Sequence, residues 1–330
     1  MILLISQSKF DLSTDLVFDW INHLGGKVLR LNGIDVINDL DFQVGLSNQG
    51  FKTCLSRIDI EQINVIWYRR WIHRGYNDFH TDEQKQGYIR SENYGATNFL
   101  FHSLKNKYWY IQDNITQQYP TKTEQLKAAV NAGFKIPNTL ICCSKESLKN
   151  FMLENNNKVI NKSISEGESF TKKGELGLYF TYTSMIDFES IEKIENSFYP
   201  SLFQNCIDKK YELRIFYDKG KLYPMAIFSA QNETTKVDFR NYDNKKPNRC
   251  VPYKLSKSEN SKIRNLMSEL NLETGSLDII VDLDNEWFFL EVNPLGQFGM
   301  VSGPCNYYIE KIIAQKLIKE DEKRKIQCTN

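Results

Sequence analysis

The chain has 330 residues, more than a single hydrophobic core usually serves, so two or three domains are expected. Apolar residues make up 41% of it and charged residues 25%, which excludes a disordered or fibrous protein. The 42 Lys and Arg against 41 Asp and Glu leave a net charge of +1, so bulk charge favours neither nucleic acid nor an anionic membrane as a partner.

Membrane and secretion signals are missing from the sequence. The longest uninterrupted apolar run, residues 1–5, is far below the roughly 20 residues that span a bilayer. The start lacks the charged region and longer apolar stretch of a secretory signal, so a cytoplasmic location is expected. The cysteines and histidines show no zinc-binding spacing, and neither a Rossmann nor a P-loop glycine motif is present.

The amino-terminal part predicts an α/β domain over residues 1–115. Residues 1–6 are a short apolar run typical of a buried strand, and helical spacing follows until Gly25-Gly26. Residues 27–32 and 64–71 predict further strands, and a helix is expected over about 83–102. Asp, Asn, Gln and Pro cluster over 112–120, which predicts a domain boundary.

The next stretch alternates helices, over about 123–132 and 146–154, with strands over 134–144 and 158–165. Lys162 alternates with Ile160 and Ile164, so it shares a strand face with apolar residues. Residues 166–177 are too polar and glycine-rich for a packed element and predict a mobile loop. A lysine beside such a loop suits a phosphate contact, although a surface hairpin turn explains the same pattern.

From about residue 200 the pattern is mostly antiparallel β. Strands are predicted over 201–207, 210–217 and 221–229, with a helix over about 258–270 and a hairpin over 276–294. A last helix over about 306–318 is followed by a charge run, residues 319–325, which is expected to fray in solvent.

The hairpin carries the strongest functional signal. A turn centred on Asp284-Asn285 places Asp278 directly opposite Glu291, and facing like charges repel unless a cation lies between them. Asn293 shares the face of Glu291, whereas Leu290 and Val292 are expected to point into the core.

This oxygen-rich set favours magnesium over zinc, and magnesium in proteins is commonly shared with substrate phosphates. The patch therefore implies a nucleoside triphosphate, although a solvated hairpin face would also explain its acids.

Two further pairs place an acid beside a guanidinium on one strand face. They are Glu212 with Arg214 and, if residues 237–240 are extended, Asp238 with Arg240. Arginine suits bidentate contact with phosphate or carboxylate, although ordinary surface ion pairing has the same pattern.

In this order, the motifs resemble the ATP-grasp superfamily, and within it the peptide-modifying ligases that make graspetides, especially the grasp-with-spasm type. The resemblance rests on Lys162, the glycine loop, QNCI (204–207), ELR (212–214), DFR (238–240) and SLDII with FFLEVNPLGQF. It implies an α+β and α/β chain with an ATP-grasp fold. The expected parts are an amino-terminal pre-ATP-grasp domain (1–115), a central lobe (116–199) and a carboxy-terminal lobe (200–330).

The resemblance also implies roles for individual residues. Lys162 would contact phosphates, Glu212 would lie near the nucleotide, and Arg214 would contact phosphate and the reacting centre. The expected hinge against adenine comprises Gln204, Asn205, Cys206 and Ile207. Asp238 and Arg240 match a DxR motif associated with the substrate carboxylate and condensation, and Asp278, Glu291 and Asn293 would hold Mg²⁺. Gln204 departs from the Glu that many relatives have at the hinge.

The implied activity is an ATP- and Mg²⁺-dependent ligase that phosphorylates Asp or Glu side chains of a ribosomally made precursor peptide. Attack by another side chain would then form an ester or amide macrocycle. The precursor peptide is the expected partner, with no nucleic acid and no membrane, and a homodimer is allowed. Two alternatives stay open: a ligase joining amino acids to a protein terminus or small molecule, and a nucleotide-binding module without catalysis.

Overall fold

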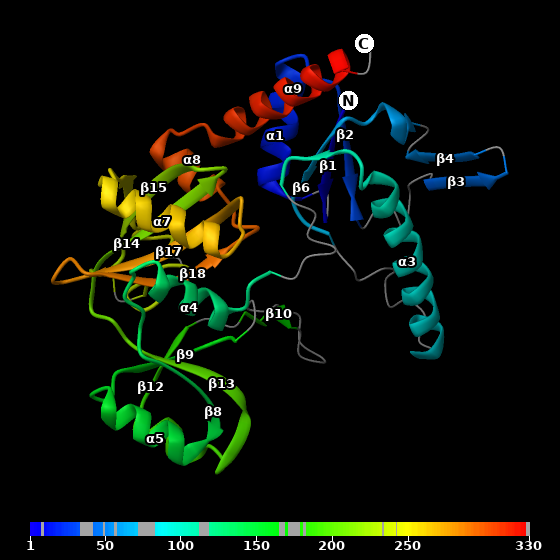
Figure 1. Ribbon diagram of the computed structural model, residues 1–330. Coiled ribbons are helices and arrows are strands. Elements are labelled where there is room, and N and C mark those ends of the chain that lie inside the picture. The colour runs from blue at the N-terminus through cyan, green and yellow to red at the C-terminus, as the bar shows by residue number, and fades with distance from the viewer. Residues whose placement is uncertain are drawn as a thin grey trace. The chain divides into compact units, whose positions relative to one another are not determined.

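The computed structural model describes residues 1–7, 10–33, 42–48, 50–55, 58–71, 83–111, 119–164, 169–170, 179–180, 183–232, 234–241 and 243–327. The chain divides into two compact units, one of residues 1–118 with 297–330 and one of residues 119–296 (Figure 1). Most of the glycine loop predicted over 166–177 lies outside the described residues; within it, β10 (Ser169–Phe170) pairs with β11 (Tyr179–Phe180).

The first unit contains a parallel sheet, which confirms the predicted α/β start. The strand order is β2 (Val28–Asn32), β1 (Ile2–Ser6), β6 (Val65–Tyr68) and β7 (Tyr108–Trp109). All five residues of β1 are buried, as a central strand of a covered parallel sheet requires. A small antiparallel sheet that the sequence did not predict comprises β3 (Phe42–Ser47), β4 (Gly50–Leu55) and β5 (Ile58–Asp59), and the short 3-10 helix η1 (Ile60–Gln62) follows it.

The helices of this unit are α1 (Leu12–His23), α3 (Glu83–Leu104), α8 (Gly299–Cys305) and α9 (Ile309–Gln327). Helix α9 packs against α1, so residues 297–330 belong with the first unit, although the prediction placed them in the carboxy-terminal lobe. The predicted fraying of residues 319–325 is wrong, because α9 continues to Gln327. Asp321 is buried there and accepts hydrogen bonds from the Met1 ammonium (2.6 Å) and Asn64 Nδ2 (2.7 Å).

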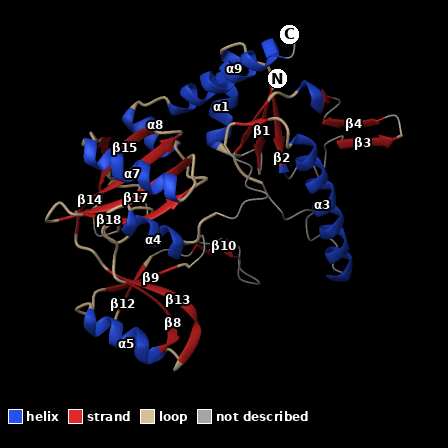
Figure 2. Ribbon diagram, in the orientation of Figure 1, coloured by secondary structure: helices blue, strands red, loops and turns tan. Residues whose placement is uncertain are grey.

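The second unit contains two antiparallel sheets, which Figure 2 shows as separate groups of strands. The smaller sheet has the order β12 (Ser184–Ile186), β9 (Val159–Lys162), β13 (Ser197–Asn205) and β8 (Thr139–Ser144). Helix α5 (Lys145–Glu154) packs on one face through Leu148, Phe151 and Met152, and α6 (Phe188–Lys193) contributes Ile191 to the same core. The opposite face is left for the site described below.

The larger sheet has the order β16 (Arg249–Pro252), β15 (Lys221–Phe228), β14 (Lys209–Asp218), β17 (Thr274–Asp282) and β18 (Trp287–Asn293). Helices α4 (Lys122–Asn131) and α7 (Lys257–Glu269) share its apolar core, and each begins with a capping box of the kind that satisfies helix amino-terminal N–H groups.

The edge strand β18 is covered: Gln125 Oε1 accepts from the Val292 N–H, and the Lys135 carbonyl accepts from the Phe289 N–H. Among the described residues, no helix is both long and apolar enough to cross a membrane.

Candidate functional site

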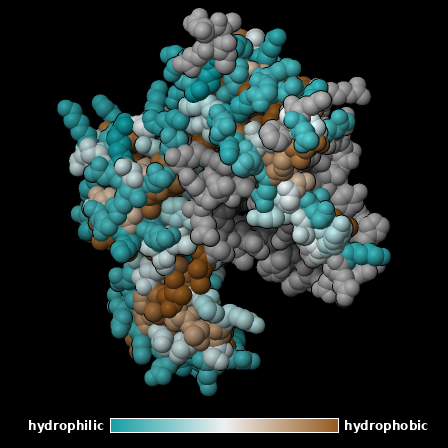
Figure 3. Space-filling view, turned by 45° about the vertical axis from the view of Figure 1, so that its right-hand side comes forward, coloured by the Kyte–Doolittle hydropathy of each residue, from teal (hydrophilic) through white to brown (hydrophobic). Residues whose placement is uncertain are grey.

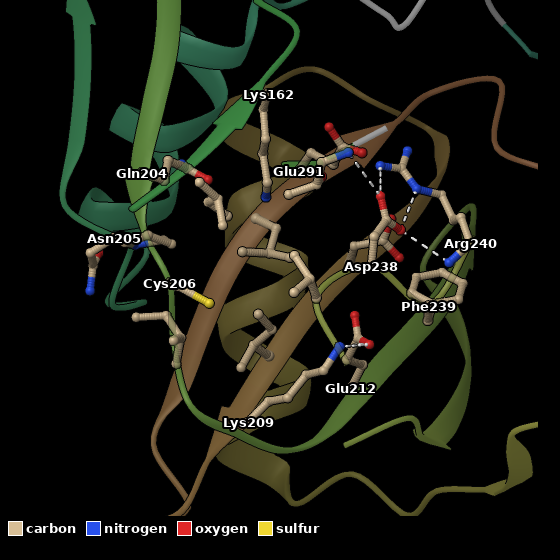
Figure 4. A pocket seen from close by; sticks show the side chains of 18 of the residues that line it. Lys162, Gln204, Asn205, Cys206, Lys209, Glu212, Asp238, Phe239, Arg240 and Glu291 are labelled. Carbon is tan, nitrogen blue, oxygen red and sulfur yellow. Dashed lines mark hydrogen bonds and ion pairs between the residues drawn. The ribbon is translucent and has the colours of Figure 1, made fainter. Parts of the chain in front are cut away.

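A cavity that is open to solvent lies between the two sheets of the second unit. Five cations and four carboxylates line it, together with the hinge: Lys122, Lys162, Lys209, Lys236 and Arg240; Glu212, Asp238, Asp278 and Glu291; and residues 204–207 (Figure 4). The dense charge predicts a polar, anionic ligand. Of the site residues predicted from the sequence, Arg214 and Asn293 do not line this cavity.

The predicted register of the carboxylate hairpin is confirmed at the position that matters. Asp278 of β17 pairs directly with Glu291 of β18, and Ser276 pairs with Asn293. The route differs from the prediction, because the turn has three residues between Asp282 and Glu286, with Asn285 at a positive φ. Near the turn, each residue of β17 therefore pairs one residue earlier on β18 than predicted, as Ile279 does with Phe289. A bulge at residue 290 then restores the predicted pairing of Asp278 with Glu291.

The bulge also corrects the predicted direction of Leu290. Phe289 and Val292 both join the buried core, so the two residues between them lie toward the other face. Leu290 therefore lines the cavity beside Glu291 instead of pointing into the core. The one-residue bulge thus places an apolar side chain, Leu290, next to the carboxylate of Glu291 in the cavity lining.

The predicted metal ligands form a set of hard oxygen donors. Two of them, Asp278 and Glu291, line the cavity, and the Oδ1 atom of Asn293 is buried without a hydrogen-bond partner among the described residues. An orphaned amide oxygen beside two facing carboxylates fits Mg²⁺. The described part of the chain contains no group of three His, Cys, Asp or Glu side chains suited to a metal, so this set has two carboxylates and needs the amide oxygen of Asn293 as its third ligand.

Asp278 is held in place by Arg214 on the neighbouring strand β14. The two residues are register partners on β17 and β14, and Arg214 Nη1 donates to Asp278 Oδ2 at 2.5 Å. Burial raises the pKa of Asp278, Arg214 opposes this, and the neighbouring Glu291 adds to it. The guanidinium Nε of Arg214 is buried and has no hydrogen-bond partner among the residues that the structure describes. Arg214 therefore positions a carboxylate of the cavity.

Two lysines converge on Glu291 from different elements. Lys122 at the start of α4 lies 3.4 Å from Glu291 Oε2, and its Nζ donates to the Ser163 carbonyl at 2.7 Å. Lys162 extends from β9 into the cavity (Figure 4), where burial lowers its pKa and Glu291 opposes that shift. Burial by itself would raise the pKa of Glu291, but Lys122, Lys162 and Arg240 together leave it below the ordinary value. Lys122 was not predicted from the sequence.

The predicted hinge lies where β13 ends, and all four of its residues line the cavity. Gln204 is buried and its Nε2 donates to Thr139 Oγ1 at 3.0 Å. The backbone N–H of Cys206 donates to the Lys158 carbonyl at 2.8 Å, which fixes the chain as it leaves the sheet. The Cys206 sulfur points into the cavity (Figure 4), and burial raises the pKa of its thiol, so it presents a neutral group.

Glu212 does not form the ion pair with Arg214 that was one explanation of their spacing in the sequence. Its Oε1 accepts from Lys209 Nζ and from Ser229 Oγ, both at 2.6 Å, inside the protein. Burial raises the pKa of Glu212, and Lys209 and Ser229 oppose this. Lys209, like Lys122 and Lys236, lines the cavity but was not predicted from the sequence, since nothing in the local pattern distinguishes it from a surface lysine.

Asp238 and Arg240 were expected to share a strand face only if residues 237–240 were extended, and this condition is not met, because the segment is a turn. Asp238 Oδ1 accepts from both the backbone N–H (3.0 Å) and the Nε (2.9 Å) of Arg240, and Oδ2 accepts from Arg240 Nη2 at 2.7 Å. The expected pairing of the two residues is thus present through a turn that Asp favours. This bidentate pair holds the pKa of Asp238 at about 2 although burial alone would raise it. Asp238 also accepts from the Thr183 N–H at 3.4 Å.

Apolar side chains extend from Lys162 across the same sheet face. Leu202 pairs with Lys162 on one side and with Ile141 on the other, so all three side chains share this face. Ile141 is 40% exposed, and Met185, which pairs with Ile160, is 48% exposed. Figure 3 shows apolar residues gathered at the surface of this lobe. An apolar surface thus adjoins the cationic end of the cavity.

Comparison with known proteins agrees with this architecture. Residues 1–119 match a family model described as the MvdD pre-ATP grasp domain. The chain superposes on a Chryseobacterium gregarium RiPP-associated ATP-grasp ligase in complex with ADP and a leader and core peptide, with 27% identity, a TM-score of 0.79 and coverage of 97% of this chain and 96% of that one.

Macrocyclase MdnC from Microcystis aeruginosa MRC, bound with precursor peptide MdnA, gives 24% identity and a TM-score of 0.80 over 96% of this chain and 99% of the other. The ATP-grasp ligase PsnB, complexed with a phosphomimetic variant of a minimal precursor, Mg and ADP, is 15% identical to this chain. Its TM-score is 0.74, and the match covers 97% of this chain and 98% of the PsnB chain. A search of curated protein sequences found no significant match.

The fold of this chain is that of the ATP-grasp ligases on which it superposes, with an amino-terminal domain that matches the pre-ATP-grasp family model. That amino-terminal domain is of the MvdD type, and the resemblance to the peptide-modifying ATP-grasp ligases predicted from the sequence is confirmed.

Proposed function

We propose that this protein uses ATP to phosphorylate Asp or Glu side chains of a ribosomally synthesised precursor peptide and then closes ester or amide cross-links within that peptide. The observation that carries the proposal is the lining of a single cavity. The hinge (204–207), the lysines that converge on Glu291, and the facing carboxylates Asp278 and Glu291 all line this cavity. Arg240, whose guanidinium is held by Asp238, lines it too.

The nucleotide would occupy this cavity with its base at the hinge and its phosphates near Lys122 and Lys162. The two lysines come from α4 and β9, so together they can contact an extended triphosphate. Their charge neutralises phosphate oxygens, which is the main assistance that phosphoryl transfer requires. Glu212, held by Lys209, is a hydrogen-bond acceptor in the same cavity as the hinge.

Mg²⁺ would be held by Asp278, Glu291 and Asn293, and when bound it neutralises charge on the terminal phosphates. In the chain itself, Arg214 fixes the orientation of Asp278, and Lys122 fixes that of Glu291. Both carboxylates are therefore preset by cations that do not depend on the ligand.

The chemistry has two steps. A carboxylate oxygen of the peptide attacks the γ-phosphorus, the bond to the bridging oxygen breaks, and ADP leaves with that electron pair. A side-chain hydroxyl or amine then attacks the acyl carbon and loses its proton, and the carbon–oxygen bond to phosphate breaks. A carboxylate is a poor electrophile until its oxygen becomes part of a phosphate, which is why ATP is consumed.

Arg240 would bind the acidic side chain of the peptide. Half of its side chain is exposed, whereas that of Asp238 is almost fully buried. The carboxylate of Asp238 occupies the Nε and Nη2 donors and so fixes the plane of the guanidinium. The outer edge remains for a second carboxylate. The exposed apolar side chains beside Lys162 offer adjacent surface to the peptide backbone.

The proposal is tested by mixing the purified protein with ATP, Mg²⁺ and a synthetic peptide that is encoded beside its gene and rich in Thr or Ser and in Asp or Glu. Release of ADP together with the loss of one water mass per ring supports it. Turnover with free amino acids in the absence of any peptide would indicate an amino-acid ligase instead. ADP binding without turnover under either condition would indicate a nucleotide-binding module.

The proposal also includes a cytoplasmic location, a peptide as the main partner in place of nucleic acid or membrane, and a homodimer as an allowed assembly.

A further inference from the structure

Lys209 is a buried lysine to which the proposed chemistry gives no role beyond holding Glu212. Its side chain is 3% exposed, and its ammonium donates to Glu212 Oε1 at 2.6 Å and to the Thr235 carbonyl at 3.2 Å. Burying an ammonium in this way is costly unless its hydrogens are all well placed. The neighbouring Lys210 is exposed and bonds Asn285 in the hairpin turn, so burial is specific to Lys209.

Each partner of Lys209 belongs to a different part of the cavity. Glu212 lies on β14, and both of the side-chain hydrogen bonds that it makes with described residues are on Oε1, so its Oε2 is the oxygen left for a ligand. Thr235 lies in the segment that leads to Asp238 and Arg240, and is 1% exposed.

Among the described residues, the other hydrogen bonds of Thr235 stay within its own stretch of chain. Its hydroxyl Oγ1 lies 3.2 Å from the Ser229 carbonyl oxygen and 2.9 Å from Asn248 Oδ1, and donates its single hydrogen to one of these two acceptors, both within residues 229–248. The Asn232 carbonyl accepts from the Thr235 N–H at 3.0 Å, also inside the segment. The ammonium of Lys209 is therefore a direct link between residue 235 and β14.

We propose that Lys209 is a positioning residue that couples the nucleotide side of the cavity, through Glu212, to the segment that carries Asp238 and Arg240. A ligand that engages Glu212 Oε2 fixes the carboxylate, the carboxylate fixes the ammonium, and the ammonium fixes the Thr235 carbonyl. Nucleotide binding thereby orders the turn that would receive the peptide acid. This inference rests on the proposed function, because it assumes that a nucleotide occupies the cavity.

The test uses ADP with Mg²⁺ as the probe and needs no peptide. Hydrogen–deuterium exchange of residues 229–241 is measured by mass spectrometry without ADP and at saturating ADP, with saturation established for each variant by calorimetry. In the wild type, ADP is expected to slow exchange in this segment by about fivefold, the lower end of typical coupling between sites.

Three variants and one control separate coupling from stability. Lys209→Met removes the link but leaves Glu212 buried without its cation, which endangers folding. The double variant Lys209→Met with Glu212→Gln removes both charges and avoids that problem. Glu212→Gln alone weakens ADP binding but keeps the ammonium near Thr235. Lys210→Met alters the exposed neighbour and is expected to behave as the wild type.

The double variant is expected to lose the ADP-dependent slowing, and Glu212→Gln is expected to retain part of it at saturating ADP. The inference is overturned if the wild-type segment does not respond to bound ADP, or if the double variant responds as strongly as the wild type. If the wild type does not bind ADP in calorimetry, it is the proposed function that fails, together with the inference that rests on it.

Discussion

The Arg214–Asp278 pair allows a quantitative test of how the cavity is supported. Arg214 Nη1 lies 2.5 Å from Asp278 Oδ2, and the two side chains are only 10% and 9% exposed. Removing one member of such a pair leaves an uncompensated buried charge and typically costs about 3–5 kcal/mol, a large share of the roughly 5–15 kcal/mol by which proteins are stable. We therefore expect Asp278→Asn and Arg214→Met each to lower the free energy of unfolding by about 3 kcal/mol.

The double variant removes both charges and is expected to lose no more stability than either single variant, which gives a coupling energy of about 3 kcal/mol. Urea denaturation followed by circular dichroism measures all four proteins. The exposed pair Lys193–Glu189 on α6 is the matched control, with side chains 71% and 80% exposed and an expected coupling of about 0.3–0.5 kcal/mol. Losses in the double variant that equal the sum of the single losses would refute the pairing.

Three further changes test the site. Glu291→Ala is expected to abolish ADP release while far-ultraviolet circular dichroism stays unchanged; normal turnover would remove Glu291 from the metal set. Arg240→Ala is expected to keep ADP affinity in calorimetry but lose cross-linking, with little rescue by Arg240→Lys; a large loss of ADP affinity would place Arg240 at the phosphates. Gly296→Ala would set its Cβ 2.3 Å from Ser276 Cβ and is expected to cost about 1–3 kcal/mol in urea denaturation, whereas Gly299→Ala, with nothing within 4 Å, should cost far less.

Most of the sheet and helix positions could be predicted because local periodicity sets them. The pairing of Asp278 with Glu291 was also predictable, but it holds because a three-residue turn and a bulge compensate each other. Alternation alone cannot reveal a bulge, which is why Leu290 was assigned to the wrong face. The turn at Asp238 was missed because its side chain bonds the backbone two residues on, a choice that competes with extension.

Residues whose roles depend on distant partners could not be predicted. The charge run in α9 appeared solvated, yet Asp321 bonds Met1 and Asn64, both far away in the sequence. Lys122 and Lys209 resembled surface lysines, since the carboxylates that they meet lie on strands placed by tertiary packing. Composition and spacing identify residue types, but only the assembled sheets determine which lysines become buried.

The central claim is that a peptide carboxylate becomes an acyl phosphate in this cavity, and isotope transfer measures that most directly. A precursor peptide labelled with oxygen-18 in its Asp and Glu side chains is incubated with the protein, ATP and Mg²⁺, and the released phosphate is analysed by mass spectrometry. We expect one labelled oxygen in the inorganic phosphate for each ring formed, with ADP as the other product. Ring formation with unlabelled phosphate, or with AMP and pyrophosphate as products, would contradict the account.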